Sequence, residues 1–360
     1  MYNKSFCEKH TKWLKMFLTL YYIMVQFRCI LFCRKIPMYN TMHIEHQPRK
    51  STVLSSSSLA CLSGVASINL TSSCAHGCIY CYSCGYSSRP SEGTVVVYSN
   101  LFEKLKSELA GKRKMPKTVY FSPSSDLFQP IPEVLQTGYE IIKLLLERKL
   151  NVAFVTKGVI PDSHFALFQK HPAQIQAQIG LISADVAVLA RFEPKAASPE
   201  IRLEQIRKLT EAGIATSVRL DPIIPGVTDD DETFTRICEA VTTVGVKKIA
   251  ASVLFLRPAI KESLQRNIFD PKILQRILTH YSSSRRLAIH ADRSSVTAIS
   301  REDREAIFKR LQSVAEKHNL GLHICGCKNP DIPVSLFSLD CRLSGSWDQR
   351  QSRKDLLSLG

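Results

Sequence analysis

Short apolar segments alternate with amphipathic segments between about residues 66 and 256. The apolar segments predict β-strands at residues 66–70, 118–122, 151–156, 175–182, 214–220 and 248–256. The segments between them repeat apolar residues at helical spacing, as Leu101, Leu105 and Leu109 do. Helices are therefore expected at residues 100–110, 133–148, 162–170, 199–212 and 230–244. Six strands alternating with helices predict an α/β fold, a parallel sheet closed by right-handed crossovers into a full or partial TIM-like barrel.

The chain is expected to have three parts. Residues 1–59 form a basic and apolar N-terminal extension with a linker, residues 60–318 the barrel, and residues 319–360 a cysteine-containing tail. The last barrel helix begins at Ser300, where the hydroxyl and Asp303 predict a capping box, and Asn100 is expected to cap the first helix.

The extension contains an apolar run at residues 13–33. Its uninterrupted core, residues 16–25, is too short to span about 30 Å of hydrocarbon, so no stable membrane span is expected. It could be a signal-like or interfacial segment. Alternatively, the true start is Met38 or Met42, and residues 1–37 have no function.

Charge and cysteine content bear on partners and compartment. The net charge is +16, which favours nucleic acid or another polyanion as a partner, although dispersed basic residues that only aid solubility would give the same balance. The 12 cysteines are clustered rather than spread as in a disulfide-rich secreted framework. A reducing compartment, the cytoplasm, is therefore expected.

Three cysteines follow the first predicted strand with the spacing CxxxCxxC: Cys74, Cys78 and Cys81. Three thiolates on one loop can hold three irons of a 4Fe-4S cluster and leave the fourth iron without a protein ligand. Cys84 extends the run to CxxxCxxCxxC. A fourth thiolate would close a zinc site or an electron-transfer cluster, so both interpretations stay open on these residues alone.

Polar residues follow the next strands, and in a barrel the ligands collect at the carboxyl ends of the strands. Asp126 and Gln129 could hydrogen-bond a polar substrate, although Asp126 could also simply cap a helix. Lys157 is placed to pair with an anion, unless it is a solvated loop lysine.

Strand 214–220 and the turn after it add two further candidates. Arg219 faces the pocket as an anion partner or pairs with Glu193 for structural reasons. Gly226 allows a close approach of the backbone to a flat ring.

The run from Asn69 to Tyr82, with Tyr80 directly before the last cysteine, resembles the radical S-adenosylmethionine (SAM) superfamily, and within it the spore photoproduct lyase-like branch. Similar segments follow in fold order as far as Pro258. They are Asp126-x-x-Gln129-Pro130, Thr156-Lys157, Glu193-Pro194 with Ser198-Pro199, and Pro222-Ile-Ile-Pro225-Gly226-x-x-Asp229.

The resemblance implies a partial (β/α)6 barrel of the radical SAM type with a 4Fe-4S cluster on Cys74, Cys78 and Cys81. It implies SAM on the open iron, near Tyr80, Lys157, Ser183, Arg219 and Gly226. The reduced cluster would cleave SAM and yield a 5'-deoxyadenosyl radical that abstracts hydrogen. The electron would come from a flavodoxin- or ferredoxin-like donor.

Three functions are considered. The first is a radical SAM enzyme acting on nucleic acid or a nucleotide, the second a peptide- or small-molecule-modifying radical SAM enzyme, and the third a non-catalytic metal-binding module for nucleic acid. The lyase places a cysteine hydrogen donor before its Thr-Ser-Asp motif. Here Pro123 precedes Ser124-Ser125-Asp126, so thymine-dimer repair itself is not expected.

The tail carries a second group of cysteines, Cys325, Cys327 and Cys341. They could ligate an auxiliary iron-sulfur cluster or zinc, with Cys84 or His323 as a fourth ligand. Buried cysteines that pack as small hydrophobic residues are the alternative.

Overall fold

The computed structural model describes residues 42–56, 62, 64–289, 295–333 and 335–337. Two compact units are distinguished, Met1–Met42 and His43–Gly360, and all that follows concerns the second. The apolar run at residues 13–33 lies outside the described residues. Within the described part, none of the helices combines the length and apolar character that a membrane crossing requires.

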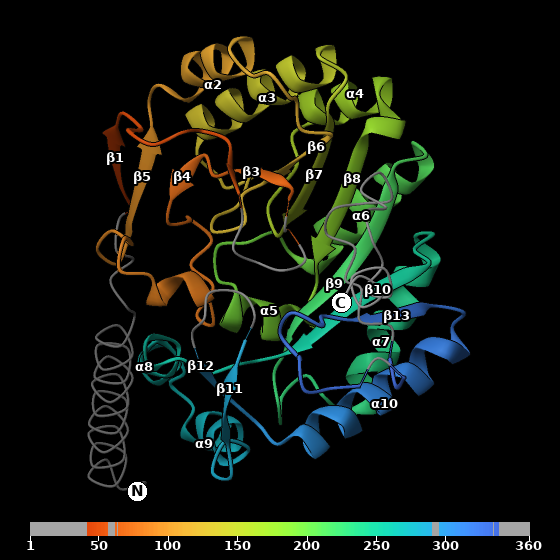
Figure 1. Cartoon of the computed structure of the whole chain (residues 1–360). Coiled ribbons are helices and arrows are strands. Elements are labelled where there is room, and N and C mark those ends of the chain that lie inside the picture. The colour runs from red at the N-terminus through yellow and green to blue at the C-terminus, as the bar shows by residue number, and fades with distance from the viewer. Residues whose placement is uncertain (1–41, 57–61, 63, 290–294, 334, 338–360) are drawn as a thin grey trace, which may run out of the picture. The chain divides into compact units, whose positions relative to one another are not determined.

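The central sheet has eight strands in the order β13-β10-β9-β8-β7-β6-β3-β2. All its pairs are parallel except the pair of β2 with β3. Its two edge strands, β13 and β2, are not paired with each other, so the sheet is the partial barrel that was predicted (Figure 1). The strands are β2 (Ser55–Ser56), β3 (Ala66–Ile68), β6 (Thr118–Phe121), β7 (Asn151–Thr156), β8 (Ile175–Gly180), β9 (Ala215–Ile223), β10 (Lys248–Val253) and β13 (Gly321–Ile324).

Helices cover the outside of this sheet, and Figure 1 shows α2, α3 and α4 beside the strands that they connect. They bury apolar faces at helical spacing, as Leu101, Leu105 and Leu109 do on α2. The helices are α2 (Leu101–Ala110), α3 (Pro132–Glu147), α4 (Asp162–Lys170), α5 (Val186–Phe192), α6 (Pro199–Glu211), α7 (Asp231–Thr243), α8 (Pro258–Asn267), α9 (Pro271–Thr279) and α10 (Arg301–Lys317).

The predicted helices all form, each with ends within two residues of the expected ones. The Ser300 cap is confirmed, since its Oγ accepts the Asp303 N–H at 2.9 Å. The Asn100 cap is wrong. Its side chain instead accepts the Arg49 N–H at 2.8 Å, because the chain before β2 runs beside this helix start.

Several short elements were not predicted. A second sheet joins β1 (His43–Gln47), β5 (Thr94–Tyr98) and β4 (Thr71–Ser72), and β11 (Arg285–Ala288) pairs with β12 (Ser295–Ala298) as an antiparallel ribbon. β13 extends the central sheet beyond residue 318, the boundary expected for the barrel. These strands depend on partners far away in the sequence, so their own residues carry a weak signal.

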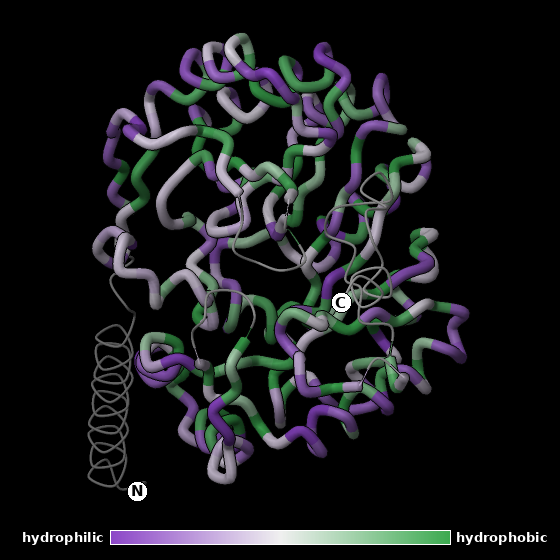
Figure 2. Tube along the Cα trace, in the orientation of Figure 1, coloured by the Kyte–Doolittle hydropathy of each residue, from purple (hydrophilic) through white to green (hydrophobic). Residues whose placement is uncertain are grey.

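The core fills the space between the sheet and its helices, and Figure 2 shows hydrophobic residues following the central strands. Phe154 on β7 and Phe168 on α4 are fully buried and stack with their ring centroids 5.6 Å apart. Phe128, from the loop after β6, meets both rings edge-on. The loop that follows β6 is thus tied to the core at one end.

A buried ion pair ties α6 to the loop after α5. Arg202 Nη2 lies 2.5 Å from Glu193 Oε2, and neither side chain is exposed. Arg202 Nη1 also donates to the Gly180 carbonyl at 2.7 Å, and Glu193 accepts the hydroxyl of Tyr80. The alternative pairing of Arg219 with Glu193 is wrong, because Glu193 faces α6.

Replacing Arg202 by Met should strongly destabilise the protein. The change leaves the Glu193 carboxylate buried and unpaired, which costs about 3–5 kcal/mol. Urea denaturation measures the loss. The matched control is Arg207→Met on the same helix, where the pairs with Glu204 and Glu211 are exposed and screened by solvent, so this variant should lose little stability. Equal losses in the two variants would contradict the role assigned to the buried pair.

Candidate functional site

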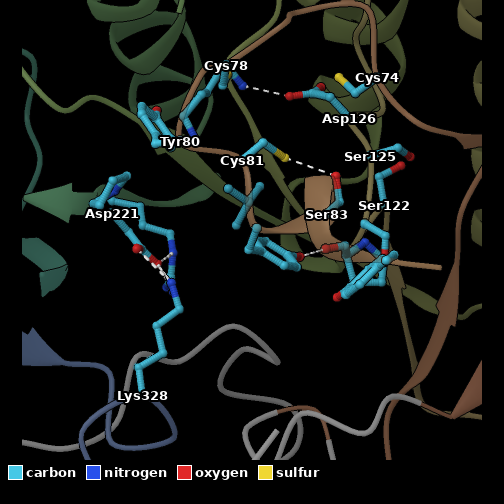
Figure 3. A pocket seen from close by; sticks show the side chains of 18 of the residues that line it. Cys74, Cys78, Tyr80, Cys81, Ser83, Ser122, Ser125, Asp126, Asp221 and Lys328 are labelled. Carbon is cyan, nitrogen blue, oxygen red and sulfur yellow. Dashed lines mark hydrogen bonds and ion pairs between the residues drawn. The ribbon is translucent and has the colours of Figure 1, made fainter. Parts of the chain in front are cut away.

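A cavity of about 500 Å³ opens at the carboxyl ends of the central strands (Figure 3). Its volume lies in the range of small-molecule sites. Residues from the end of nearly every parallel strand line it, as the barrel rule predicts. Among these residues are Asn69, Cys74, Cys78, Cys81, Ser122, Asp126, Lys157, Arg219, Asp221, Leu254, Cys325 and Lys328.

The three cysteines of the CxxxCxxC loop all line this cavity. The loop turns at Ser73 and Gly77, which have φ angles of 70° and 65°. The left-handed conformation is cheap for glycine and uncommon for serine, so these residues are the tight points of the loop. The Ile79 N–H donates to the Phe192 carbonyl at 3.0 Å, which joins the loop to the end of α5.

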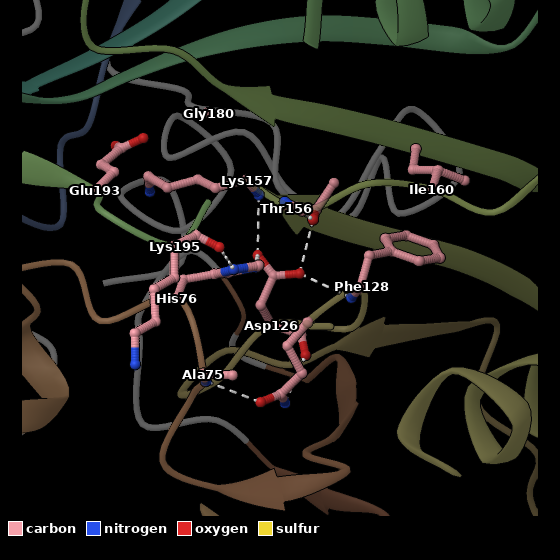
Figure 4. A network of polar contacts seen from close by, with 12 residues as sticks. Ala75, His76, Asp126, Phe128, Thr156, Lys157, Ile160, Gly180, Glu193 and Lys195 are labelled. Carbon is pink, nitrogen blue, oxygen red and sulfur yellow. Dashed lines mark hydrogen bonds and ion pairs between the residues drawn. The ribbon is translucent and has the colours of Figure 1, made fainter. Parts of the chain in front are cut away.

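A buried carboxylate, Asp126, organises the other side of the loop (Figure 4). Asp126 Oδ2 lies 3.3 Å from His76 Nε2, and the other ring nitrogen of His76 donates to the Lys195 carbonyl at 3.2 Å. Asp126 also accepts the Thr156 hydroxyl at 2.7 Å and the Lys157 N–H at 2.9 Å. One carboxylate therefore links the cysteine loop to the end of β7.

The pKa of Asp126 reflects this environment. Burial alone would raise the pKa, but His76 and the hydrogen bonds from Thr156 and the Lys157 N–H together lower it below its ordinary value. Asp126 is thus held as a carboxylate. His76 was not singled out from the sequence, although its place between the first two cysteines was an available signal.

Gln129 is also structural in this arrangement. Its Oε1 accepts the Ala75 N–H at 3.0 Å, and its Nε2 donates to Thr71 Oγ1 at 2.8 Å. The side chain is fully buried and does not line the cavity. Of the two residues expected to contact the substrate, Asp126 therefore lines the cavity. Gln129 does not, and it holds the start of the cysteine loop through Thr71 and Ala75.

Lys157 enters the cavity beside the cysteines. Its Nζ lies 5.7 Å from the centre of the Tyr80 ring. A methyl group at Gly180 would come within 2.9 Å of Lys157 Cγ, so this glycine leaves room for the lysine. Burial would lower the pKa of Lys157, but nearby Glu193 and Cys78 raise it above its ordinary value. The ammonium therefore stays charged.

A second charged group lies across the cavity. Asp221 accepts hydrogen bonds from Lys328 Nζ at 2.7 Å and from Arg219 Nη2 at 2.7 Å (Figure 3). Burial would raise the pKa of Asp221, but Lys328 and Arg219 lower it. Sequence reasoning found Arg219 and missed the other two. Lys328 follows strand β13, which was not predicted, so no sequence pattern around Lys328 indicated that it pairs with Asp221.

Two predicted SAM contacts lie elsewhere. Neither Ser183 nor Gly226 is among the cavity-lining residues. The Ser183 hydroxyl accepts the Asp185 N–H at 3.0 Å, directly before α5. A methyl group at Gly226 would come within 2.7 Å of Arg276 Cγ, so α9 covers this turn.

Cys84 lies next to Cys81 but does not line the cavity. A hydrogen bond from the Cys84 thiol lowers the pKa of Cys81 to about 5. Across the described residues, no three His, Cys, Asp or Glu side chains come together as a site for one metal ion. A 4Fe-4S cluster spreads its thiolates over separate irons, so three cysteines around one cavity fit it as a donor set.

The tail cysteines also border the cavity. Cys325 is 2% exposed and packs with Leu62, Val65 and Tyr120, while Cys327 packs against the same apolar cluster. This surrounding matches the alternative of small hydrophobic residues. Cys341 lies outside the described residues.

Comparison with known proteins finds a match to the model of the radical SAM superfamily over residues 68–237. The Radical SAM Nalpha-GlyT isomerase of Pseudomonas phage M6 is 26% identical over 204 residues, which are 55% of this chain and 42% of the isomerase. This chain thus spans less than half of that relative. An uncharacterized protein of Acidianus two-tailed virus is 24% identical over 218 residues, or 56% of this chain and 71% of that protein.

Among solved structures, a spore photoproduct lyase mutant superposes with a TM-score of 0.63 at 15% identity. The match covers 79% of this chain and 82% of the lyase. At this identity the likeness shows the shared fold alone. It agrees with the predicted partial barrel.

Replacing Asp221 by Asn should lower the free energy of unfolding by about 2–4 kcal/mol at neutral pH, because two cations lose their buried partner. The folded-state pKa is depressed, so this stabilisation is fully present above the ordinary aspartate pKa, about 4, and is lost as the pH falls below it. Denaturation at several pH values should therefore show the variant and the wild type converging in acid. The exposed Asp231→Asn change serves as the control, and a constant gap down to low pH would contradict the assignment.

Proposed function

We propose that this chain, which matches the radical SAM superfamily over residues 68–237, is a radical SAM enzyme that abstracts hydrogen from a nucleotide-like substrate. One observation carries this proposal. Three thiols from a single loop border a cavity at the carboxyl ends of the strands, and a charged lysine lies beside them.

The residues of the chain divide the work of this site. Cys74, Cys78 and Cys81 would hold a 4Fe-4S cluster, which with SAM supplies a 5'-deoxyadenosyl radical when both are bound. Lys157 would pair with the SAM carboxylate, because its ammonium is charged and lies at the rim of the same cavity. The walls exclude water and orient the substrate toward the cysteine side.

Buried contacts position this machinery. The Tyr80 hydroxyl donates a hydrogen bond to Glu193, and this bond fixes the orientation of Tyr80 directly before Cys81. His76, inside the loop, is held against Asp126. Through these contacts Glu193 and Asp126 position the cysteine loop without needing to touch the substrate, so we assign them as positioning residues.

The nature of the cavity supports a nucleotide-like substrate. Tyr82, Tyr86 and Tyr120 offer aromatic surface on which a base could stack. Arg89 and Arg257 supply positive charge, beside Arg219 and Lys328, which share the Asp221 carboxylate. A relative is named for an Nalpha-GlyT isomerase, and a spore photoproduct lyase mutant has been solved with bound AdoMet and dinucleoside spore photoproduct. A peptide or small-molecule substrate is the alternative within the same reaction class.

The reaction also needs an electron and a reducing environment. A flavodoxin- or ferredoxin-like protein would supply the electron. A cluster with an open iron requires a reducing compartment, which favours the cytoplasm.

Anaerobically reconstituted protein should contain about four irons per chain and convert SAM with dithionite into 5'-deoxyadenosine. Cys78→Ala should lose most of the iron and all of the product, because one corner of the cluster has no ligand. Cys84→Ala should retain both, since Cys84 lies outside the cavity. Full iron content without 5'-deoxyadenosine, or loss of iron in Cys84→Ala, would favour a closed, non-catalytic site.

The enzyme should not revert spore-photoproduct dinucleotide to thymidines. Pro123 lines the cavity where the lyase motif has its cysteine, and proline has no S–H hydrogen to donate. Product analysis after incubation with SAM and dithionite measures the reversion, and formation of 5'-deoxyadenosine shows that the preparation is active. Efficient reversion would refute this prediction while leaving the superfamily assignment intact.

A further inference from the structure

A second, smaller pocket of about 160 Å³ borders the main cavity. The two share part of their lining, namely Asn69, Ser83, Tyr86, Arg89 and Ser124. The volume is below the range of sites that enclose a whole small molecule. It suits one small group that projects from a ligand in the main cavity.

The lining of this side pocket is polar and positively charged. Two guanidinium groups, Arg49 and Arg89, belong to it, and no Asp or Glu is among the residues that line it. The Arg49 side chain is fixed over the Tyr98 ring at 5.2 Å, and its Nε donates to the Thr52 carbonyl at 2.9 Å. Its Nη1 also donates to the Asn69 carbonyl at 3.2 Å, and none of these partners among the described residues carries a negative charge.

Hydroxyl groups complete the lining. They come from β4 and the residue after it, from the segment that follows Cys81, from the end of β5 and from the loop after β6: Thr71, Ser72, Ser73, Ser83, Tyr86, Ser88, Tyr98 and Ser124. Serine, threonine and tyrosine hydroxyls together with arginine are the groups that proteins use to contact phosphate oxygens.

Arg89 provides the observation that points to a ligand. Its Nη1 is buried and has no hydrogen-bond partner within the part of the chain that the structure describes. The guanidinium also hydrogen-bonds the Cys84 thiol, a weak acceptor, and its charge helps to lower the pKa of Cys81, so the contact that it lacks is an acceptor for Nη1. A buried cationic donor without an acceptor is costly and calls for a partner, such as a bound anion.

We propose that the side pocket is a phosphate-binding subsite that receives the phosphate adjoining the reacting nucleotide. This inference rests on the proposed function, because it takes the occupant of the main cavity to be a nucleotide. Arg89 lies on the wall between the two pockets, so a phosphate there would pair with its free N–H while the base and sugar extend toward the cysteines. Arg49, on the far wall, adds the second positive charge.

The test is displacement of a fluorescein-labelled oligothymidylate from the full-length reconstituted protein, followed by anisotropy at fixed low salt. The competitors are thymidine, thymidine 5'-phosphate, thymidine 3'-phosphate and inorganic phosphate. One of the two nucleotides should displace the label at roughly a tenfold lower concentration than thymidine, which is the size of one charge-assisted hydrogen bond. Inorganic phosphate alone should be weak.

Arg89→Gln should remove the advantage of that nucleotide, and Arg89→Lys should keep part of it, because charge without the planar fork still attracts phosphate. Arg113→Gln is the matched control, since it removes the same charge from an exposed loop before β6 and outside both pockets. It should behave like the wild type.

Equal displacement by thymidine and both nucleotides in the wild type would overturn the subsite and leave the proposed function standing. The subsite would also be overturned if the preferred nucleotide still displaced the label at a lower concentration than thymidine in Arg89→Gln. Inorganic phosphate as effective as the preferred nucleotide would overturn the assignment to the substrate and indicate a free-phosphate site. Failure of the oligothymidylate to bind at all would count against both the subsite and the nucleotide substrate.

Discussion

Two buried carboxylates hold the cysteine loop against the sheet, and the arrangement of the site depends on them. Asp126 ties His76 to the end of β7, and Glu193 ties Tyr80 to Arg202 on α6. Buried charges persist only when they are paired and hydrogen-bonded, so each carboxylate fixes its partners closely. The loop that carries Cys74, Cys78 and Cys81 is thus clamped between two helix–strand units.

The open, parallel sheet explains why so many unlike residues meet in one place. Parallel strands bring all their carboxyl ends to one edge, and loops of different length then add side chains to a shared cavity. The cysteines come from the loop after β4, Lys157 from the end of β7, Asp221 from β9 and Lys328 from beyond β13. The side chains differ from strand to strand, so one wall of the cavity carries the thiols and another carries the charges around Asp221.

The two pockets together suggest how such a scaffold could distinguish substrates. The main cavity combines aromatic rings with paired charges, and the side pocket combines two arginines with hydroxyls and no acid. The proposed reaction would take place beside the cysteines, and the choice of substrate would depend on the residues that line the rest of the two pockets.

The secondary-structure elements and the cysteine loop could be predicted from local patterns. The alternation of apolar and amphipathic segments is a local signal, so the central strands and the helix over residues 162–170 could be predicted closely, and the cysteine spacing indicated three ligands on one turn. The pairing of charged side chains became clear from the folded structure alone. Glu193 pairs with Arg202 rather than Arg219, and Asp221 finds Lys328 at 107 residues' distance along the chain. Such pairings depend on how the strands are arranged around the cavity. The periodicity of one segment shows nothing about which other segment lies beside it in the fold.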